Sequence, residues 1–113
     1  MMHEHGHGWW KAELYRLRGE LLLLQTGRGS DVLTEAASCF RQALDIASRQ
    51  QAKSLELRAA TSLSRLLKRQ GKRDDAQRVL AEIYGWFTEG FDLPDLRDAK
   101  ALLDDLLDPP AAQ

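Results

Sequence analysis

Apolar residues of this chain recur every three or four positions in five segments, with polar residues between them. In the first segment, residues 9–25, an apolar stripe advances in steps of four, three, four and three residues, through Trp10, Leu14, Leu17, Leu21 and Leu24. This spacing is that of an α-helix. Tyr15 and Leu22 belong to a second stripe, and a helix that is apolar on two sides is expected to lie between two neighbours.

Four further segments carry the same period, at about residues 32–50, 52–70, 73–88 and 94–107. Ser30 or Asp31 is expected to cap the second helix, since short polar side chains bond the free N–H groups of a first turn. Gly71 is expected just after the third helix, and Pro94 suits the first turn of the fifth. No segment alternates with period two, so the sequence predicts an all-α fold of five helices.

An internal repeat organises these helices. Ala36-x3-Phe40-x2-Ala43 aligns with Ala76-x3-Leu80-x2-Ile83, and Tyr15-x2-Arg18-Gly19-x2-Leu22 aligns with Ala60-x2-Leu63-Ser64-x2-Leu67. The aligned positions are further apart along the chain in the second alignment than in the first, because the turn after the first helix is longer than the turn at Gly71. The chain is therefore interpreted as two helix-turn-helix units and a final helix, with helices crossing closely where the side chain is a hydrogen or a methyl group.

These positions resemble the tetratricopeptide repeat. The second unit matches best, as Leu63-Ser64-x2-Leu67-x3-Gly71-x4-Ala76-x3-Leu80, and the first places Gly19 at the small position of its first helix. The closing proline of the repeat is missing from both units, and Ser48 stands in its place in the first. The resemblance implies a right-handed α-solenoid of two repeats and a C-terminal capping helix.

A second resemblance concerns longer stretches of sequence. Four stretches are similar to the last repeats of bacterial predicted ATPases and adenylate/guanylate cyclase-type regulatory proteins, namely 10–23, 37–47, 55–63 and 84–91. This resemblance implies that residues 9–107 correspond to the C-terminal repeat region of such a regulator. The catalytic activities of that group do not carry over, because the chain has neither its phosphate-binding glycine loop nor its cyclase residues.

Composition and charge narrow the function classes further. The chain has 113 residues, with 16 Lys and Arg against 17 Asp and Glu, a size typical of one domain. Near-balanced charge argues against nucleic acid and against a polybasic membrane anchor, and Leu21–Leu24 is too short an apolar run to span a bilayer. The single Cys39 permits no intrachain disulfide, which favours a cytoplasmic location. We expect a flexible His-rich leader over 1–8, one repeat domain over 9–107 and a disordered tail over 108–113.

The small net charge conceals an asymmetry, because residues 52–90 carry +3 and residues 91–113 carry −4. Arg58, Arg65 and Arg69 lie within about 40° of one another on a helix that turns 100° per residue. If this helix lines a concave groove, the groove could bind an acidic peptide or a C-terminal carboxylate. The candidate groove residues are Arg58, Thr61, Ser62, Arg65, Lys68 and Arg69. The plainer alternative is that these cations favour their helix C-terminus and are attracted to the acidic last helix.

Two other features are candidate contact sites. The last helix carries aspartates opposite its leucines, as a polar cap would, whereas the N-terminal end has no such cap. Trp9 and Trp10 are therefore candidates for contact with a preceding repeat or with a second copy of the chain. His3, His5 and His7 are weak metal-ligand candidates, set against a plain leader without fixed geometry. Cys39 is expected to be a small buried core residue.

These observations favour a non-enzymatic protein–protein interaction module without a cofactor. A helix-borne histidine pair, a nucleophile with a candidate base and a phosphate loop are all missing from the sequence. Two alternatives stay open, a purely structural extension of a solenoid or homodimerisation module, and metal binding through the histidine tract.

Overall fold

The computed structural model describes residues 9–25, 29–90 and 92–107, and they form five helices. The helices are α1 (Trp9–Leu24), α2 (Ser30–Arg49), α3 (Lys53–Arg69), α4 (Arg73–Tyr84) and α5 (Pro94–Leu107). No strand occurs among the described residues, which confirms the all-α prediction. The expected leader at 1–8 and tail at 108–113 lie outside them.

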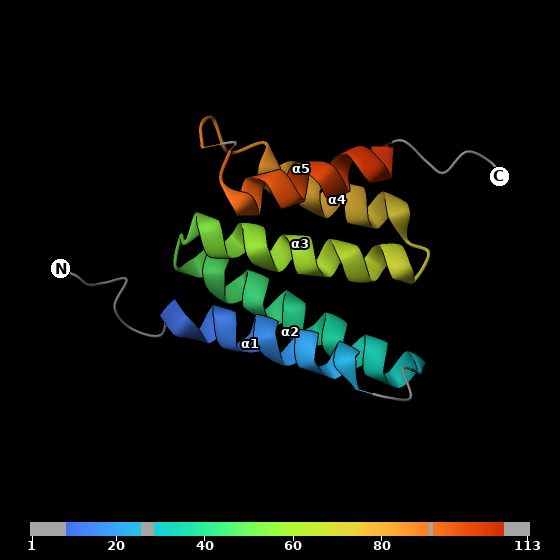
Figure 1. Cartoon of the computed structure of the whole chain (residues 1–113). Coiled ribbons are helices and arrows are strands. Elements are labelled where there is room, and N and C mark those ends of the chain that lie inside the picture. The colour runs from blue at the N-terminus through green and yellow to red at the C-terminus, as the bar shows by residue number, and fades with distance from the viewer. Residues whose placement is uncertain (1–8, 26–28, 91, 108–113) are drawn as a thin grey trace.

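Consecutive helices form antiparallel neighbours, and α3 lies at the centre of the stack (Figure 1). Helix α3 contacts α2 and α4 along its length and also touches α1 and α5. Helices α1, α3 and α5 run in the same direction on one face, with α2 and α4 behind them (Figure 1). This packing is compatible with a helical repeat.

The core forms around the apolar stripe of α3. Leu63 and Leu66 of this helix are fully buried, together with Phe40 of α2 and Leu80 of α4. The leucines of α5 join the same cluster on their inward side. Because α3 has neighbours on most of its surface, only one narrow face of it stays open, and that face carries the cations considered below.

The turns after α2 and α3 share one motif. After α3, Gly71 has a φ of +82°, and the N–H of Lys72 donates to the carbonyl of Leu67 at 2.8 Å. After α2, Gln51 has a φ of +56°, and the N–H of Ala52 donates to the carbonyl of Ala47 at 2.9 Å. This is the Schellman arrangement, which satisfies late helix carbonyls and favours glycine at the left-handed position. The prediction for Gly71 is confirmed, whereas a non-glycine residue at the equivalent position, Gln51, gave no sequence signal.

Two helix ends differ from the predictions. Helix α2 begins at Ser30, so Gly29 occupies its N-cap position and Asp31 lies within its first turn. Asp31 therefore acts through its charge at the positive end of the helix rather than as a cap. Helix α4 ends at Tyr84, before the expected Thr88, and Gly85 follows at its C-cap.

The two apolar sides of α1 meet different surroundings. Ala12 and Gly19 are buried, and Leu22 and Leu23 pack against the core. The other side remains open, with five side chains between 48% and 80% exposed, Trp10, Leu14, Leu17, Leu21 and Leu24. The expectation that α1 lies between two neighbours is therefore met on one side only among the described residues. No described helix combines the length and apolar character needed to cross a membrane.

Candidate functional site

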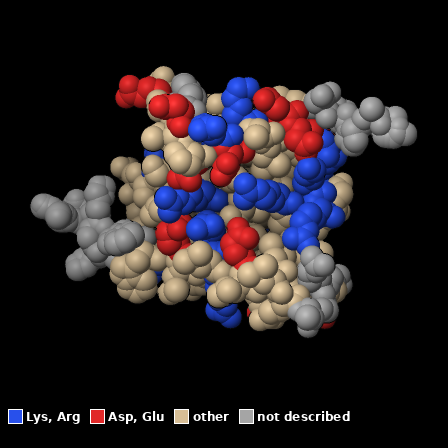
Figure 2. Space-filling view, viewed as in Figure 1, with Lys and Arg blue, Asp and Glu red and all other residues tan. Residues whose placement is uncertain are grey.

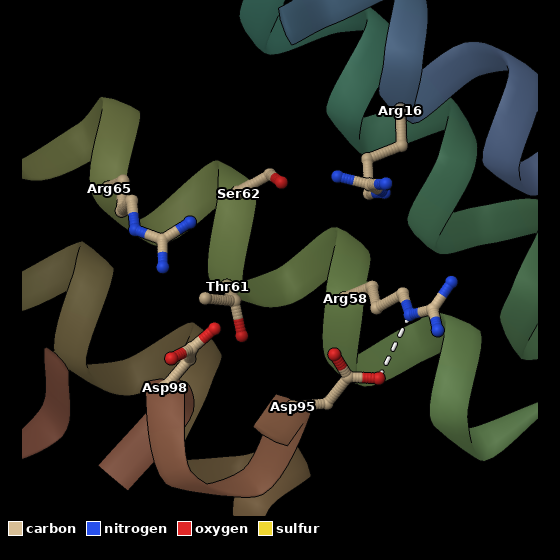
Figure 3. Close-up of a pocket in the computed structure, with 7 residues that line it drawn as sticks. All are labelled: Arg16, Arg58, Thr61, Ser62, Arg65, Asp95 and Asp98. Atoms are coloured by element: carbon tan, nitrogen blue, oxygen red, sulfur yellow. Dashed lines mark hydrogen bonds and ion pairs between the residues drawn. The ribbon is translucent and has the colours of Figure 1, made fainter. Parts of the chain in front are cut away.

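Helices α1, α3 and α5 border a concave pocket of about 220 Å³ on their shared face. Figure 3 shows its lining, which consists of Arg16, Arg58, Thr61, Ser62, Arg65, Asp95 and Asp98. Four of the six predicted groove residues are therefore brought together here. The other two, Lys68 and Arg69, lie further along α3, outside this lining.

Helix α3 supplies the floor of the pocket because of its residue spacing. Arg58, Thr61, Ser62 and Arg65 follow one another at intervals of three, one and three residues, which places them on one side of a helix. Thr61 and Ser62 are only 6% and 3% exposed, so the floor is polar but closely packed. In Figure 2 basic side chains form a band across the middle of this face, over α3, with acidic side chains beside it.

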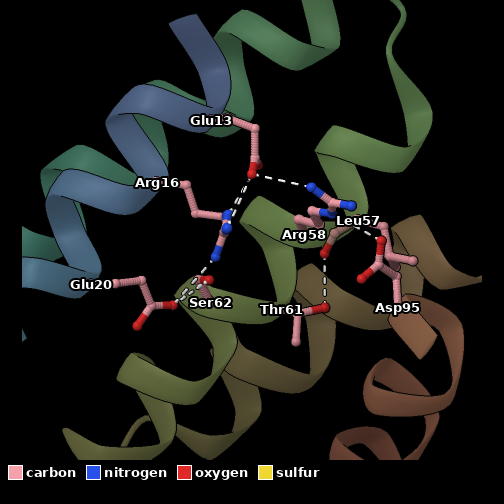
Figure 4. Close-up of polar contacts among 8 residues, drawn as sticks. All are labelled: Glu13, Arg16, Glu20, Leu57, Arg58, Thr61, Ser62 and Asp95. Carbon is pink, nitrogen blue, oxygen red and sulfur yellow. Dashed lines mark hydrogen bonds and ion pairs between the residues drawn. The ribbon is translucent and has the colours of Figure 1, made fainter. Parts of the chain in front are cut away.

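A chain of alternating charges crosses one end of the pocket, from α1 over α3 to α5 (Figure 4). Arg16 binds Glu13 through two hydrogen bonds of 3.0 Å and lies 3.7 Å from Glu20. Arg58 donates from Nη1 to Glu13 at 3.2 Å and from Nε to Asp95 at 2.9 Å. The guanidinium of Arg58 thus ties α1 to α5, and its charge is matched by two carboxylates.

The hydroxyl groups of the floor also donate within the chain. Thr61 Oγ1 donates to the carbonyl of Leu57, and Ser62 Oγ donates to Glu20 Oε2, both at 2.8 Å. Each hydroxyl oxygen keeps lone pairs that can accept a hydrogen bond. The two side chains are therefore held in fixed positions and can meet a ligand as acceptors.

The cations of α3 differ in whether they have partners. Lys68 pairs with Asp105 of α5, whose backbone carbonyl also accepts a hydrogen bond of 2.6 Å from Arg73, the first residue of α4. Within the described ranges, Arg65 and Arg69 make no ion pair and donate no side-chain hydrogen bond, and both are exposed. The attraction to the acidic last helix is therefore observed for Arg58 and Lys68, and it leaves two arginines available.

Electrostatic interactions keep the ion-paired groups of α1, α3 and α5 charged. Burial raises the pKa of Glu13, but the guanidinium groups of Arg16 and Arg58 outweigh it and hold that pKa below its ordinary value. The hydrogen bond to Asp95 raises the pKa of Arg58, and the hydrogen bond from Lys68 lowers the pKa of Asp105. The ion pairs are therefore present across the neutral range.

Several residues of the site were missed by the sequence reasoning. Arg16, Asp95 and Asp98 line the pocket but come from α1 and α5, far from the α3 motif in sequence. The excess of acid after residue 91 was a signal for Asp95. Nothing in the local pattern of α1 pointed Arg16 toward α3, because that orientation depends on how the two helices pack.

The remaining candidates fall outside the pocket. Trp10 is half-exposed near the start of α1, while the side chain of Trp9 and all of His3, His5 and His7 lie outside what the structure describes. The described residues contain no group of three or more His, Cys, Asp or Glu that could hold a metal ion. Cys39 is buried, as predicted, and burial raises the pKa of its thiol.

The pocket therefore presents one unpaired guanidinium, Arg65, and one carboxylate without a partner in the described chain, Asp98. A guanidinium binds a carboxylate in a two-pronged geometry, and a carboxylate accepts N–H groups. The arrangement suits binding of a polar chain segment. Comparison with family models, with curated proteins and with solved structures gives no match.

Proposed function

We propose that this chain is a non-enzymatic protein-interaction module that binds an acidic peptide segment along α3. The observation that supports this most directly is the pair Arg65 and Arg69. They are one helical turn apart, exposed, and without partners in the described chain. Two guanidinium groups at this spacing can bind successive carboxylates, or an acidic side chain and a C-terminal carboxylate.

The paired residue Arg58 marks one end of the proposed site. Arg58 is matched by Glu13 and Asp95, so that end of the pocket holds α1 and α5 together rather than attracting an anion. Asp98 on the α5 wall would accept a backbone N–H of the peptide. The acidic residues of the ligand would then lie toward Arg69.

At the level of fold and host protein, the proposal is a tetratricopeptide-like right-handed solenoid from the C-terminal repeat region of a bacterial ATPase or cyclase-type regulator. The sequence resemblance supports it, as does the placement of α1, α3 and α5 on one face. The lone cysteine supports a cytoplasmic location for that regulator.

The test uses fluorescence anisotropy with a labelled peptide that ends in consecutive glutamates, with a free or an amidated C-terminus. The Arg65→Glu/Arg69→Glu variant is compared with Arg41→Glu/Arg97→Glu, which makes the same charge change at exposed arginines outside the pocket. We expect binding that weakens with salt, a loss of at least about tenfold for the first variant and little change for the second. Equal binding by the two variants, or no binding by the unmodified chain, would overturn the proposal.

A structural or homodimerisation role is the second candidate function, and the open side of α1 favours it. The groove and that open side are different surfaces. The two roles can therefore coexist in one molecule and can be tested separately.

A further inference from the structure

The exposed apolar side chains of α1 lie along one line on the helix surface. Eight large apolar side chains are prominently exposed among the described residues, and five of them lie on α1. They are Trp10, Leu14, Leu17, Leu21 and Leu24, and we call them the α1 stripe. The other three, Trp86, Leu93 and Leu107, are scattered over different parts of the chain. A contiguous apolar patch of this kind marks an interaction surface.

The spacing of the α1 stripe specifies the shape of its partner. Steps of four and three residues give a period of 3.5, which is the two-position seam of a coiled coil. A broader apolar face would suit a groove between two helices. This narrow line suits a single helix that packs alongside α1 at a shallow angle.

The sequence outside the described ranges carries no apolar stripe that would match that helix. Residues 1–8 contain two methionines as their only large apolar side chains, and residues 108–113 contain none. Helix α5 of another copy is also a poor match. Its exposed side carries Arg97 and the Lys100–Asp104 ion pair, which would be buried against leucine in a head-to-tail stack.

The charges beside the α1 stripe favour a second α1. Lys11 and Arg18 lie along one edge of the stripe, and Glu13 and Glu20 lie along the other. Within the chain Arg18 already lies 4.0 Å from Glu35, and both glutamates lie beside Arg16, so these charges would be shared between the copies. If two α1 helices pack in parallel about a two-fold axis, the basic edge of each faces the acidic edge of the other. Antiparallel packing would instead place like charges together.

We infer that this chain forms a two-fold dimer in which α1 packs in parallel against α1 of a second copy, burying the α1 stripe. Glu13 and Glu20 also border the α3 groove, so the dimer brings Lys11 and Arg18 of the second copy to the groove rim. The inference does not depend on peptide binding in that groove.

Sedimentation velocity over a wide range of protein concentrations tests the dimer. We expect the unmodified chain to have twice the monomer mass, and the Leu17→Glu/Leu21→Glu variant to be a monomer with unchanged helical circular dichroism. The control Leu93→Glu/Leu107→Glu, which changes exposed leucines elsewhere, should remain a dimer. A monomeric unmodified chain at every concentration would overturn the inference, as would a dimer that survives the glutamates on α1.

Disulfide cross-linking tests the orientation. A disulfide needs two Cα atoms within about 7 Å. A parallel pair brings Leu24 close to Leu24 of the other copy, so Leu24→Cys should cross-link with itself, whereas the unmodified chain, whose Cys39 is buried, should not. Cross-linking that occurs only when Leu24→Cys is mixed with Trp10→Cys would show antiparallel packing and would overturn the parallel arrangement.

Discussion

Gly19 of α1 lies directly against the ring of Phe40 of α2. A Cβ atom at Gly19 would be 2.6 Å from Cε1 and 2.9 Å from Cδ1 of Phe40, closer than packed carbon atoms can lie. In the second unit, the residue aligned with Gly19 is Ser64, and its hydroxyl donates to the carbonyl of Ala76 on α4 at 3.0 Å. Leu80, which aligns with Phe40, is smaller than Phe40, just as Ser64 is larger than Gly19. Each unit therefore pairs a smaller residue on its first helix with a larger one on its second, in different proportions.

The Gly19→Ala substitution should destabilise the fold. The added methyl group must displace the Phe40 ring within a packed core, and overpacking of this kind costs about 1–3 kcal/mol. This exceeds the gain of up to about 1 kcal/mol that alanine offers over glycine in a helix. Urea unfolding followed by circular dichroism measures the difference.

The Phe40→Leu substitution provides the matched control for that experiment, because it copies the second unit. In the Gly19→Ala background it should recover part of the lost stability, while alone it should destabilise by leaving a cavity. Strictly additive effects of the two substitutions would contradict the contact between these residues.

The Gln51→Gly substitution should stabilise the chain by roughly 0.5–1 kcal/mol, because Gln51 occupies the left-handed region at a position equivalent to Gly71. Thermal unfolding should show a higher midpoint. Gln42→Gly, in the exposed interior of α2, is the control and should destabilise by about 1 kcal/mol. A lower midpoint for Gln51→Gly would contradict the assigned turn.

Arg58 and Arg65 should differ in their effect on stability although both line the pocket. Arg58→Ala removes the bridge between Glu13 and Asp95, and we expect a loss of roughly 0.5–1 kcal/mol because the pairs are partly exposed. Arg65→Ala should leave the free energy of unfolding unchanged to within about 0.5 kcal/mol, since Arg65 has no partner in the described chain. Equal losses in urea unfolding would show that Arg65 is also a structural residue.

Glu56 should weaken the fold as the pH rises toward neutral. Its side chain is buried, and burial raises its pKa above the ordinary 4.5 despite Lys53 and a hydrogen bond from Ser48. The native chain therefore binds this proton more tightly than the unfolded chain does. The stability that the bound proton contributes is complete below the ordinary pKa and is lost as the pH rises through the raised pKa. The Glu56→Gln variant should gain stability relative to the unmodified chain between about pH 4 and pH 7.

Glu13→Gln is the contrasting variant, because the pKa of Glu13 is lowered and its contribution is present above the ordinary value. Its stability relative to the unmodified chain should fall as the pH rises from the lowered pKa to about pH 5, and should stay level from there to neutral pH. Parallel pH profiles for the two variants, measured by urea unfolding, would contradict the assigned environments.

Much of the fold followed from local pattern. The helical period identified all five helices, and small residues at Gly19 and Ala36 marked where α1 and α2 approach. The pocket could be predicted from the sequence only in part. The α3 residues share one side by spacing alone, but Arg16 and Asp98 could be placed only once α1 and α5 were packed beside α3.

The sequence by itself determined which residues become helix and which side of α3 carries its cations, because both depend on a period of about 3.6 residues. Tertiary structure decided which cations remain available. Arg58 and Lys68 meet carboxylates from distant helices, and Arg65 does not. It also decided that the side of α1 with Trp10 and four leucines stays open, because α2 and α3 pack against the other sides of this helix.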